Sequence, residues 1–296
     1  MRVSGVRLLL GLGALLAGFA GPAAAQAVNK TEQAAVNRFA ANNSLFVLYH
    51  EIGHLLVDQL DLPVLGKEED AADNMATWML LRRGTKTADQ ALADAAYGWL
   101  LSGLAYGSDI ADEDLYANHS LDRQRAFQIV CLMVGSDAKT FRSIANDYAI
   151  DDDRQGSCAA DYGLVNRSLN ILVGGGARKI ERPTEVTVVY HEVNGTLKQA
   201  ADAFRASGVF DQVANELRSQ YSLPRPIRFS AERCGEANAF YDPDIIEISF
   251  CYEMMQDFID LYGTGTAKGA MPGTRQIPRL GKPKNKTKPQ LRHYLY

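Results

Sequence analysis

The sequence predicts an α+β fold, in which a helical N-terminal part precedes a smaller part that mixes strands and helices. Up to about residue 173, apolar residues recur at helical spacing in one segment after another. Three glycines at 174–176 mark a change, because the segment EVTVVYHEV that follows alternates and is rich in β-branched residues. We therefore expect a helical part over residues 26–173 and an α/β part over residues 180–263.

The first well-defined helix is expected over residues 45–60. Asn42, Asn43 and Ser44 precede it and are residues that commonly cap a helix N-terminus. Apolar residues then fill several faces, as in a helix that is buried on most sides. The helix should end before Pro63, because the residue that precedes a proline avoids helical geometry.

Further elements follow from the same patterns. A second helix is expected over residues 68–83, where alanine and methionine recur at helical spacing, and one long amphipathic helix over residues 196–221. Other helical segments are ADQALADAAYGWLLSGLAYG, SLDRQRAFQIVCLMVGS, SDAKTFRSIANDYAI and CAADYGLVNRSLNILV. The expected strands after the long helix are PIRFSAERC, NAFYDP and IIEISFCYE, with a turn at Asp242 and Pro243.

The chain begins with the pattern of a secretory signal peptide. Arg2 and Arg7 precede an apolar run, and three alanines at 23–25 supply an A-x-A cleavage site before Gln26. The run is shorter than the roughly 20 residues of a membrane span and is interrupted by glycines. We expect residues 1–25 to be removed, which predicts an exported protein, periplasmic or secreted, with no transmembrane span after cleavage.

Four cysteines fit an oxidising compartment. Cys131 and Cys158 bracket a helical region, and Cys234 and Cys251 bracket a predicted hairpin. Local pairing would give two disulfides, but four cysteines allow three connectivities and the sequence does not choose among them. Neither pair has the C-x-x-C spacing of a zinc ribbon, so we do not expect the cysteines to bind metal.

Charge is unevenly distributed along the chain. Residues 264–296 contain eight lysines and arginines and no acids, which leaves a net charge of about −14 on residues 26–263. An acidic body argues against nucleic acid as the main partner. The basic segment 264–296 is expected to be a solvated, disordered tail. A weak contact with the cell-envelope surface or an autoinhibitory role is an alternative.

The segment FVLYHEIGHL carries the strongest chemical signal. Positions i and i+4 of a helix share a face, so His50 and His54 can both bind one tetrahedral zinc ion. Glu51 lies about 100° around the helix, beside the metal, where it can act as general base on zinc-bound water. Zinc lowers the pKa of that water to about 7, which makes hydroxide available at neutral pH.

A third ligand is expected from the segment EEDAADNMA on the next helix. Glu69 and Asp73 are one turn apart, so Glu69 can bind zinc while Asp73 accepts the outer N–H of a ligating histidine. Glu68 and Asp70 are alternatives to Glu69. The helix dipole favours acids in any first turn, but it does not explain why they follow an H-E-x-x-H motif.

These blocks resemble a known family. The stretch HEIGHLLVDQLDLPVLGKEEDAAD is similar to zincin-type metallopeptidases of exported bacterial proteins, the DUF4344 family, and residues 119–137 and 234–253 resemble it too. The resemblance implies a zinc metallopeptidase with one Zn²⁺ per chain and a peptide or protein substrate. Glu69 then matches the third ligand of gluzincin-like enzymes.

One feature departs from the zincin pattern. In zincins the sheet normally precedes the active-site helix, whereas here the segment CYE (251–253) lies near the C-terminus. We favour a permuted order, in which the C-terminal sheet docks beside the N-terminal helix and offers a strand edge to an extended peptide. An appended second domain is the alternative. Permutation would also allow Tyr252 or Glu253 to face the zinc, although a structural role suits Glu253 better.

His119 and His191 lie outside the H-E-x-x-H motif, and two other functions fit the same residues. His119 opens a helix and could donate a hydrogen bond to the oxyanion formed on a substrate carbonyl, or it could be an ordinary surface residue. His191 follows a predicted strand and is expected to have no catalytic role. A zinc-binding envelope scaffold without proteolysis, and a zinc hydrolase acting on non-peptide amides or esters, are alternative functions.

Overall fold

The computed structural model describes residues 22–106, 110–174 and 183–267. The expected signal peptide, except its last four residues, and nearly all of the basic tail therefore lie outside the described residues. Contacts divide the chain into two units at Ala35. In the first unit the described residues are the opening turns of one helix, and all the other described elements belong to the second unit, which starts at Val36.

Helices form most of the described structure, together with one small sheet. This confirms the predicted α+β class. The helices are α1 (Pro22–Gln59), α2 (Glu68–Arg83), α3 (Lys86–Tyr106), α4 (Asp112–Tyr116), α5 (Asp122–Ser136), α6 (Ala138–Asp147), α7 (Asp152–Leu172), α8 (Lys198–Ser207), α9 (Val209–Gln220) and α10 (Tyr252–Ala267). The strands are β1 (Val186–Tyr190), β2 (Ile227–Glu232), β3 (Ala239–Asp242) and β4 (Glu247–Cys251), and a short 3₁₀ turn, η1 (Gly195–Leu197), precedes α8.

The start predicted for the first helix is wrong. Helix α1 runs through Asn43 and Ser44, which are buried inside it instead of capping it. The Asn43 side chain donates to the carbonyl of Phe39 at 2.9 Å, and the Ser44 hydroxyl donates to the carbonyl of Ala40 at 2.9 Å. Each polar side chain thus bonds to a carbonyl in the preceding turn of the same helix. This bond satisfies the side chain although it is buried within the helix.

Three further predictions are corrected in the C-terminal part. The single helix expected over residues 196–221 is two helices, because Gly208 adopts a positive φ of 69° that ends α8 and precedes α9. The strand expected to run to residue 253 stops at Cys251, where α10 begins. Helix α10 reaches Ala267, four residues into the segment expected as a tail.

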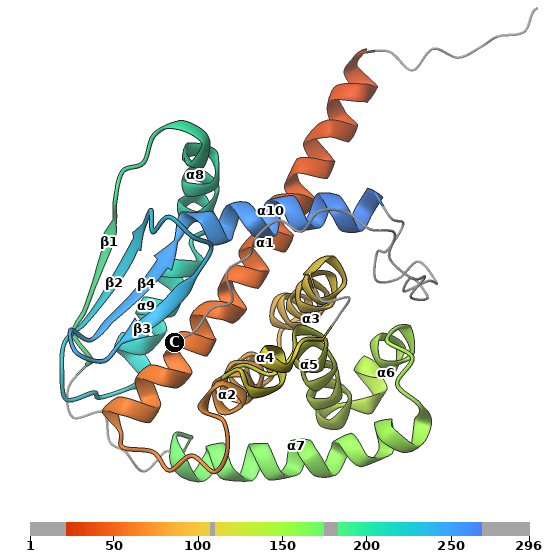
Figure 1. Ribbon diagram of the computed structural model, residues 1–296, viewed down its shortest axis with the longest axis vertical. Helices are drawn as coiled ribbons and strands as arrows, with labels where there is room; N and C mark the ends of the chain where they lie inside the picture. The colour runs from red at the N-terminus through yellow and green to blue at the C-terminus, as the bar shows by residue number, and fades with distance from the viewer. Residues whose placement is uncertain (1–21, 107–109, 175–182, 268–296) are drawn as a thin grey trace, which may run out of the picture. The chain divides into compact units, whose positions relative to one another are not determined.

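Helix α1 lies between the two halves of this unit, as Figure 1 shows. The sheet and helices α8 and α9 lie on one side of it, helices α2–α7 lie on the other, and α10 crosses α1 from the sheet toward α3. Its side chains bond to the C-terminal half: the Tyr49 hydroxyl bonds to Glu216 of α9, and Tyr241 of β3 donates to Asp58 at 2.6 Å. The helix that carries the H-E-x-x-H motif is therefore packed against both halves.

The sheet has the strand order β1-β2-β4-β3. Strands β1, β2 and β4 are parallel, and β3 pairs antiparallel with β4 at one edge. Helices α8 and α9 cover one face with aromatic rings. The ring of Phe204 stacks on that of Phe250 with their centres 4.0 Å apart, and the ring centres of Phe210 and Phe229 are 5.1 Å apart. Such aromatic pairs add to the hydrophobic stabilisation of the layer.

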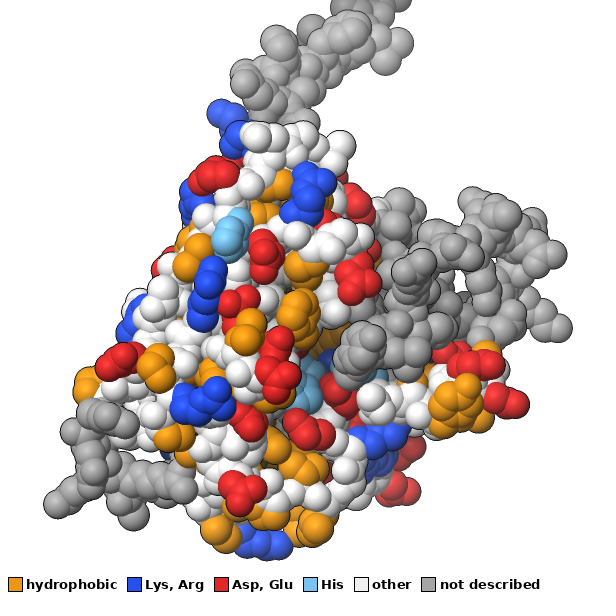
Figure 2. Space-filling model, turned by 60° about the vertical axis from the view of Figure 1, so that its left-hand side comes forward, with side chains coloured by type: hydrophobic (Ala, Val, Ile, Leu, Met, Phe, Trp, Pro, Cys, Tyr) orange, Lys and Arg blue, Asp and Glu red, His pale blue; other side chains and the backbone are white. Residues whose placement is uncertain are grey.

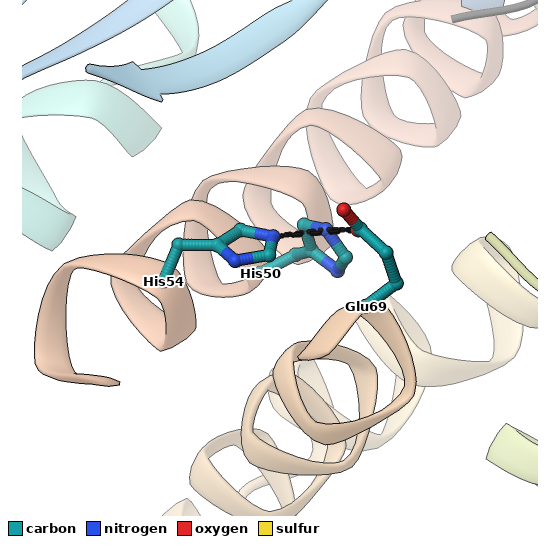
Figure 3. A group of neighbouring side chains, drawn as sticks. All are labelled: His50, His54 and Glu69. Carbon is teal, nitrogen blue, oxygen red and sulfur yellow. Dashed lines mark hydrogen bonds and ion pairs between the residues drawn. The ribbon is translucent and has the colours of Figure 1, made fainter. Parts of the chain in front are cut away.

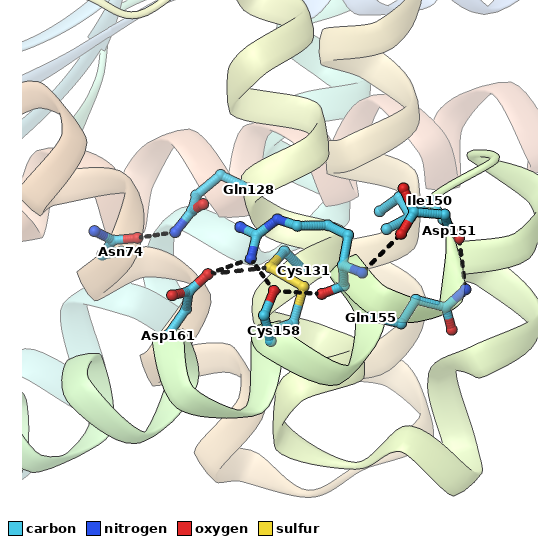
Figure 4. Close-up of a disulfide and its surroundings, with 10 residues drawn as sticks. Asn74, Gln128, Cys131, Ile150, Asp151, Gln155, Cys158 and Asp161 are labelled. Carbon is cyan, nitrogen blue, oxygen red and sulfur yellow. Dashed lines mark hydrogen bonds and ion pairs between the residues drawn. A yellow bond between two sulfur atoms is a disulfide. The ribbon is translucent and has the colours of Figure 1, made fainter.

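Each disulfide joins two cysteines that are near in sequence. This local pairing is one of the three possible connectivities. Cys131 of α5 bonds to Cys158 of α7, as Figure 4 shows, and Cys234 bonds to Cys251 at the end of β4. Asp161 lies near the Cys131 sulfur, but the bonded cysteines are not free to bind metal there. Among the described residues, no helix has the length and apolar character needed to cross a membrane.

Candidate metal centre

The candidate site forms where helices α1 and α2 approach each other closely. Gly53 of α1 faces Ala72 of α2, and a Cβ placed on Gly53 would lie only 2.9 Å from the Ala72 Cα. The absence of a side chain at residue 53 thus permits this approach. As a result, His50 and His54 on α1 come within reach of Glu69, one turn before Ala72 on α2 (Figure 3).

Three ligand atoms converge at this point. The Nε2 atoms of His50 and His54 are 3.1 Å apart, and the Glu69 Oε2 atom lies 3.1 Å from the first and 3.3 Å from the second. Ligand atoms about 2.0–2.1 Å from a tetrahedral zinc would be roughly 3.3 Å from one another. The three separations therefore fit three corners of such a tetrahedron.

The outer nitrogen of each ring has its own acidic partner. Nδ1 of His50 lies 2.8 Å from Asp73 Oδ1, and Nδ1 of His54 lies 2.7 Å from Glu68 Oε1. A carboxylate holds a proton on the ring nitrogen that it faces, so each Nε2, when its ring is neutral, can offer a lone pair to a cation beside Glu69. Two lone pairs and a carboxylate oxygen meeting at one point are the donor set of a cation site.

The acids around His50 favour a positive charge at this point, which a proton or a cation can supply. Burial lowers the pKa of His50, but hydrogen bonds with Asp73 and Glu69 outweigh burial and raise that pKa to about 9. A metal ion bound here would have to displace this proton. The residues present therefore fit a divalent cation, which brings positive charge to the same place.

Glu51 and His119 lie near this group in different ways. Glu51 is buried, and burial raises the pKa of its carboxyl against the opposing charges of His50 and His54. His119 has its Nε2 atom 2.7 Å from Glu69 Oε2, and its ring stacks on that of His50 at 5.9 Å. Burial raises the pKa of Glu69, but hydrogen bonds from the three histidines hold it well below its usual range.

Comparison with known proteins gives the family. The family model of DUF4344, described as "Putative metallopeptidase", matches residues 20–173 and 190–278. The chain belongs to the DUF4344 family. No curated protein and no solved structure matches the chain. The family indicates a metal-dependent peptidase with peptide substrates, and His50, His54 and Glu69 of this DUF4344 protein are a possible site for its metal.

One buried residue at the centre was missed by the sequence analysis. Arg125 of α5 donates two hydrogen bonds to the Asp73 carboxylate, at 2.7 and 2.8 Å. Burial raises the pKa of Asp73, but the charge and hydrogen bonds of Arg125 hold it below its usual range. A signal was present, because Arg125 lies among apolar residues on the buried face of its helix and a buried arginine needs a partner.

The C-terminal candidates have other partners. The Tyr252 hydroxyl donates to the carbonyl of His191 at 2.9 Å. Glu253 accepts hydrogen bonds from the backbone N–H groups of Cys234 and Gly235 at 3.2 and 2.9 Å, so it supports the hairpin that the second disulfide closes.

Figure 2 shows histidine side chains in a hollow of the surface with acidic side chains around them. The side chains of His54 and His119 are 14% and 29% exposed, so the site reaches the protein surface.

Proposed function

We propose that this protein is an exported, zinc-dependent metallopeptidase with a gluzincin-like site. His50, His54 and Glu69 would hold one Zn²⁺, and Glu51 would be the general base. The observation that carries the proposal is the convergence of two Nε2 atoms and one carboxylate oxygen within 3.3 Å of one another. Zinc suits two imidazoles and one carboxylate with an open fourth position.

The chain's own residues would perform the remaining chemistry. Bound zinc would polarise the scissile carbonyl and lower the pKa of a water molecule. Glu51 would take the proton from that water and pass it to the leaving amine, a role that its raised pKa suits. Asp73 would keep the proton of His50 on Nδ1. His119 would donate a hydrogen bond to the developing oxyanion, from its place beside Glu69.

We propose further that the two parts, residues 26–173 and 180–263, complete one catalytic unit. Strand β3 is the antiparallel edge of the sheet, and its Tyr241 bonds to Asp58, one turn beyond His54 on α1. An extended peptide could pair with such an edge while its scissile bond lies over the metal. This arrangement would correspond to a zincin fold with its sheet placed after the active-site helix.

Export rests on separate observations. The chain begins with a signal-peptide pattern, and all four cysteines are paired in disulfides. Disulfides persist in the periplasm and outside the cell but rarely in the cytosol. We therefore propose a periplasmic or secreted location. The basic tail, which carries eight lysines and arginines, would supply at most a weak contact with the envelope surface.

The proposal is tested by metal content and by digestion of a peptide library with and without a chelator. Wild-type protein should bind one zinc and show chelator-sensitive cleavage. Glu51→Gln should keep the zinc and lose cleavage, because it removes only the base, whereas His54→Ala should lose both. His191→Ala is the matched control and should change neither, because its side chain is exposed away from the cluster. Purified protein without stoichiometric metal would refute the proposal, and zinc without cleavage would favour a scaffold role.

A further inference from the structure

Arg125 is a buried cation one helix away from the proposed ligands. Its side chain is only 7% exposed, and its Nε and Nη2 atoms donate to the two oxygens of Asp73 at 2.7 and 2.8 Å. Two parallel bonds between a guanidinium and a carboxylate fix the plane of the carboxylate as well as its position. Asp73 is therefore held in a single orientation.

That orientation is the one that His50 needs. Oδ1 of Asp73 accepts a bond from Arg125 and also lies 2.8 Å from Nδ1 of His50. A continuous polar chain thus runs from α5 through α2 to α1, and all three side chains in it are buried. Without the guanidinium, the carboxylate could rotate about its Cβ–Cγ bond. The His50 ring would then lose the partner that aims Nε2 at Glu69.

Arg125 is itself held in place from other directions. Its guanidinium carbon lies 3.6 Å from the centre of the Trp99 ring on α3, a distance at which a cation is attracted to the aromatic face. Helix α5 is also tied to α7 by the disulfide between Cys131 and Cys158. The guanidinium is therefore positioned before any metal binds, so no free energy of metal binding is needed to order it.

We propose that Arg125 is a positioning residue for the metal centre, which sets metal affinity through Asp73 and the ring of His50. The inference rests on the proposed function, because it assumes that His50 binds a metal. Lysine cannot replace arginine here, since its ammonium is a point charge without the planar fork that fixes a carboxylate. The effect of Arg125 should therefore depend on both its shape and its charge, and it should vanish when Asp73 is absent.

The test is a Co²⁺ titration of metal-free full-length protein, followed by visible absorption. Loss of a group that holds a metal ligand in place typically weakens metal binding by about 10–100-fold, so Arg125→Met should weaken Co²⁺ binding by about tenfold or more. Arg125→Lys should recover only part of that loss. In the Asp73→Asn background, Arg125→Met should cause no further loss. Arg154→Met is the matched control, because it removes a 2.7 Å ion pair with Asp161 on the exposed side of α7.

Each outcome decides between distinct claims. If wild-type protein binds no Co²⁺, the proposed metal site itself fails. If wild-type protein binds Co²⁺ and Arg125→Met binds it equally well, the positioning role fails while the metal site stands. An equal fold-loss with and without Asp73 would show that Arg125 only supports the fold. If Arg125→Met does not fold, two other variants still allow the comparison. These are Arg125→Lys and the double variant Asp73→Asn with Arg125→Met, which buries a neutral pair.

Discussion

Replacing Gly53 by alanine tests how closely the two helices of the candidate metal centre must approach. A Cβ at residue 53 would lie 2.9 Å from the Cα and 3.0 Å from the Cβ of Ala72, whereas contacting carbon atoms prefer about 3.5–4.0 Å. The obstacle is largely backbone, so it cannot move aside by a change of rotamer. Helices α1 and α2 would have to separate by roughly 0.6–1 Å.

The magnitude follows from two opposing effects. Overpacking costs about 1–3 kcal/mol, and the better helix propensity of alanine returns about 1 kcal/mol. We expect Gly53→Ala to lower the free energy of unfolding by about 1 kcal/mol, or up to about 2 kcal/mol. Metal sites tolerate distance errors of only about 0.2 Å. Separation of the helices should therefore weaken zinc binding by at least about tenfold as Glu69 moves away from His50 and His54.

Gly163→Ala on helix α7 is the matched control for this experiment. A Cβ there would have no heavy atom within 4 Å, so the substitution should stabilise the protein by about 0.5–1 kcal/mol and leave zinc binding unchanged. Urea unfolding gives the stability of both variants, and a competition titration with a coloured chelator gives their zinc affinity. If Gly53→Ala proves as stable as Gly163→Ala and binds zinc like the parent, the close approach of α1 and α2 has no functional importance.

Three other predictions address stability. Replacing Cys131 and Cys158 by serine opens a loop with a separation of 27 residues and should cost about 3.5 kcal/mol; an unchanged urea midpoint would contradict this. Burial raises the pKa of Asp94, so its contribution to stability is present below its unfolded pKa and lost as the pH rises through its folded pKa. Asp94→Asn should therefore flatten the fall of unfolding free energy that begins as the pH rises above the ordinary pKa of an aspartate, and an unaltered slope would count against it. A chain that ends at residue 173 should aggregate, because the face of α1 that bonds to α9 and β3 becomes exposed; a monomeric, zinc-binding fragment on size-exclusion chromatography would argue for an appended domain.

That His50, His54 and Glu69 lie together could be predicted because their arrangement is local. Helical spacing alone places His50 and His54 on one face, and the acids of the following helix are few enough to name Glu69 and Asp73. Arg125 could not be found in this way. Its role depends on α5 packing against α2, a long-range contact for which a single sequence carries no spacing rule.

The errors in the predicted fold have a common physical origin. Asn43 and Ser44 have the intrinsic preference of helix caps, but burial and bonds to the preceding turn keep them inside α1. The amphipathic pattern of residues 196–221 runs through Gly208, whereas the positive φ of that glycine ends one helix and starts the next. In each case the tertiary environment decided between conformations that the local sequence allows.

The charges at the candidate site explain why a cation suits it better than a proton alone. Four carboxylates, those of Glu51, Glu68, Glu69 and Asp73, surround the histidines, and three of the four are mostly withdrawn from solvent. Arg125 compensates one of these charges. Buried carboxylates remain ionised only when positive charge is close to them. A divalent cation would supply that charge at the point where the lone pairs of both Nε2 atoms and the Glu69 oxygen meet, whereas a proton can satisfy only one pair of these atoms at a time.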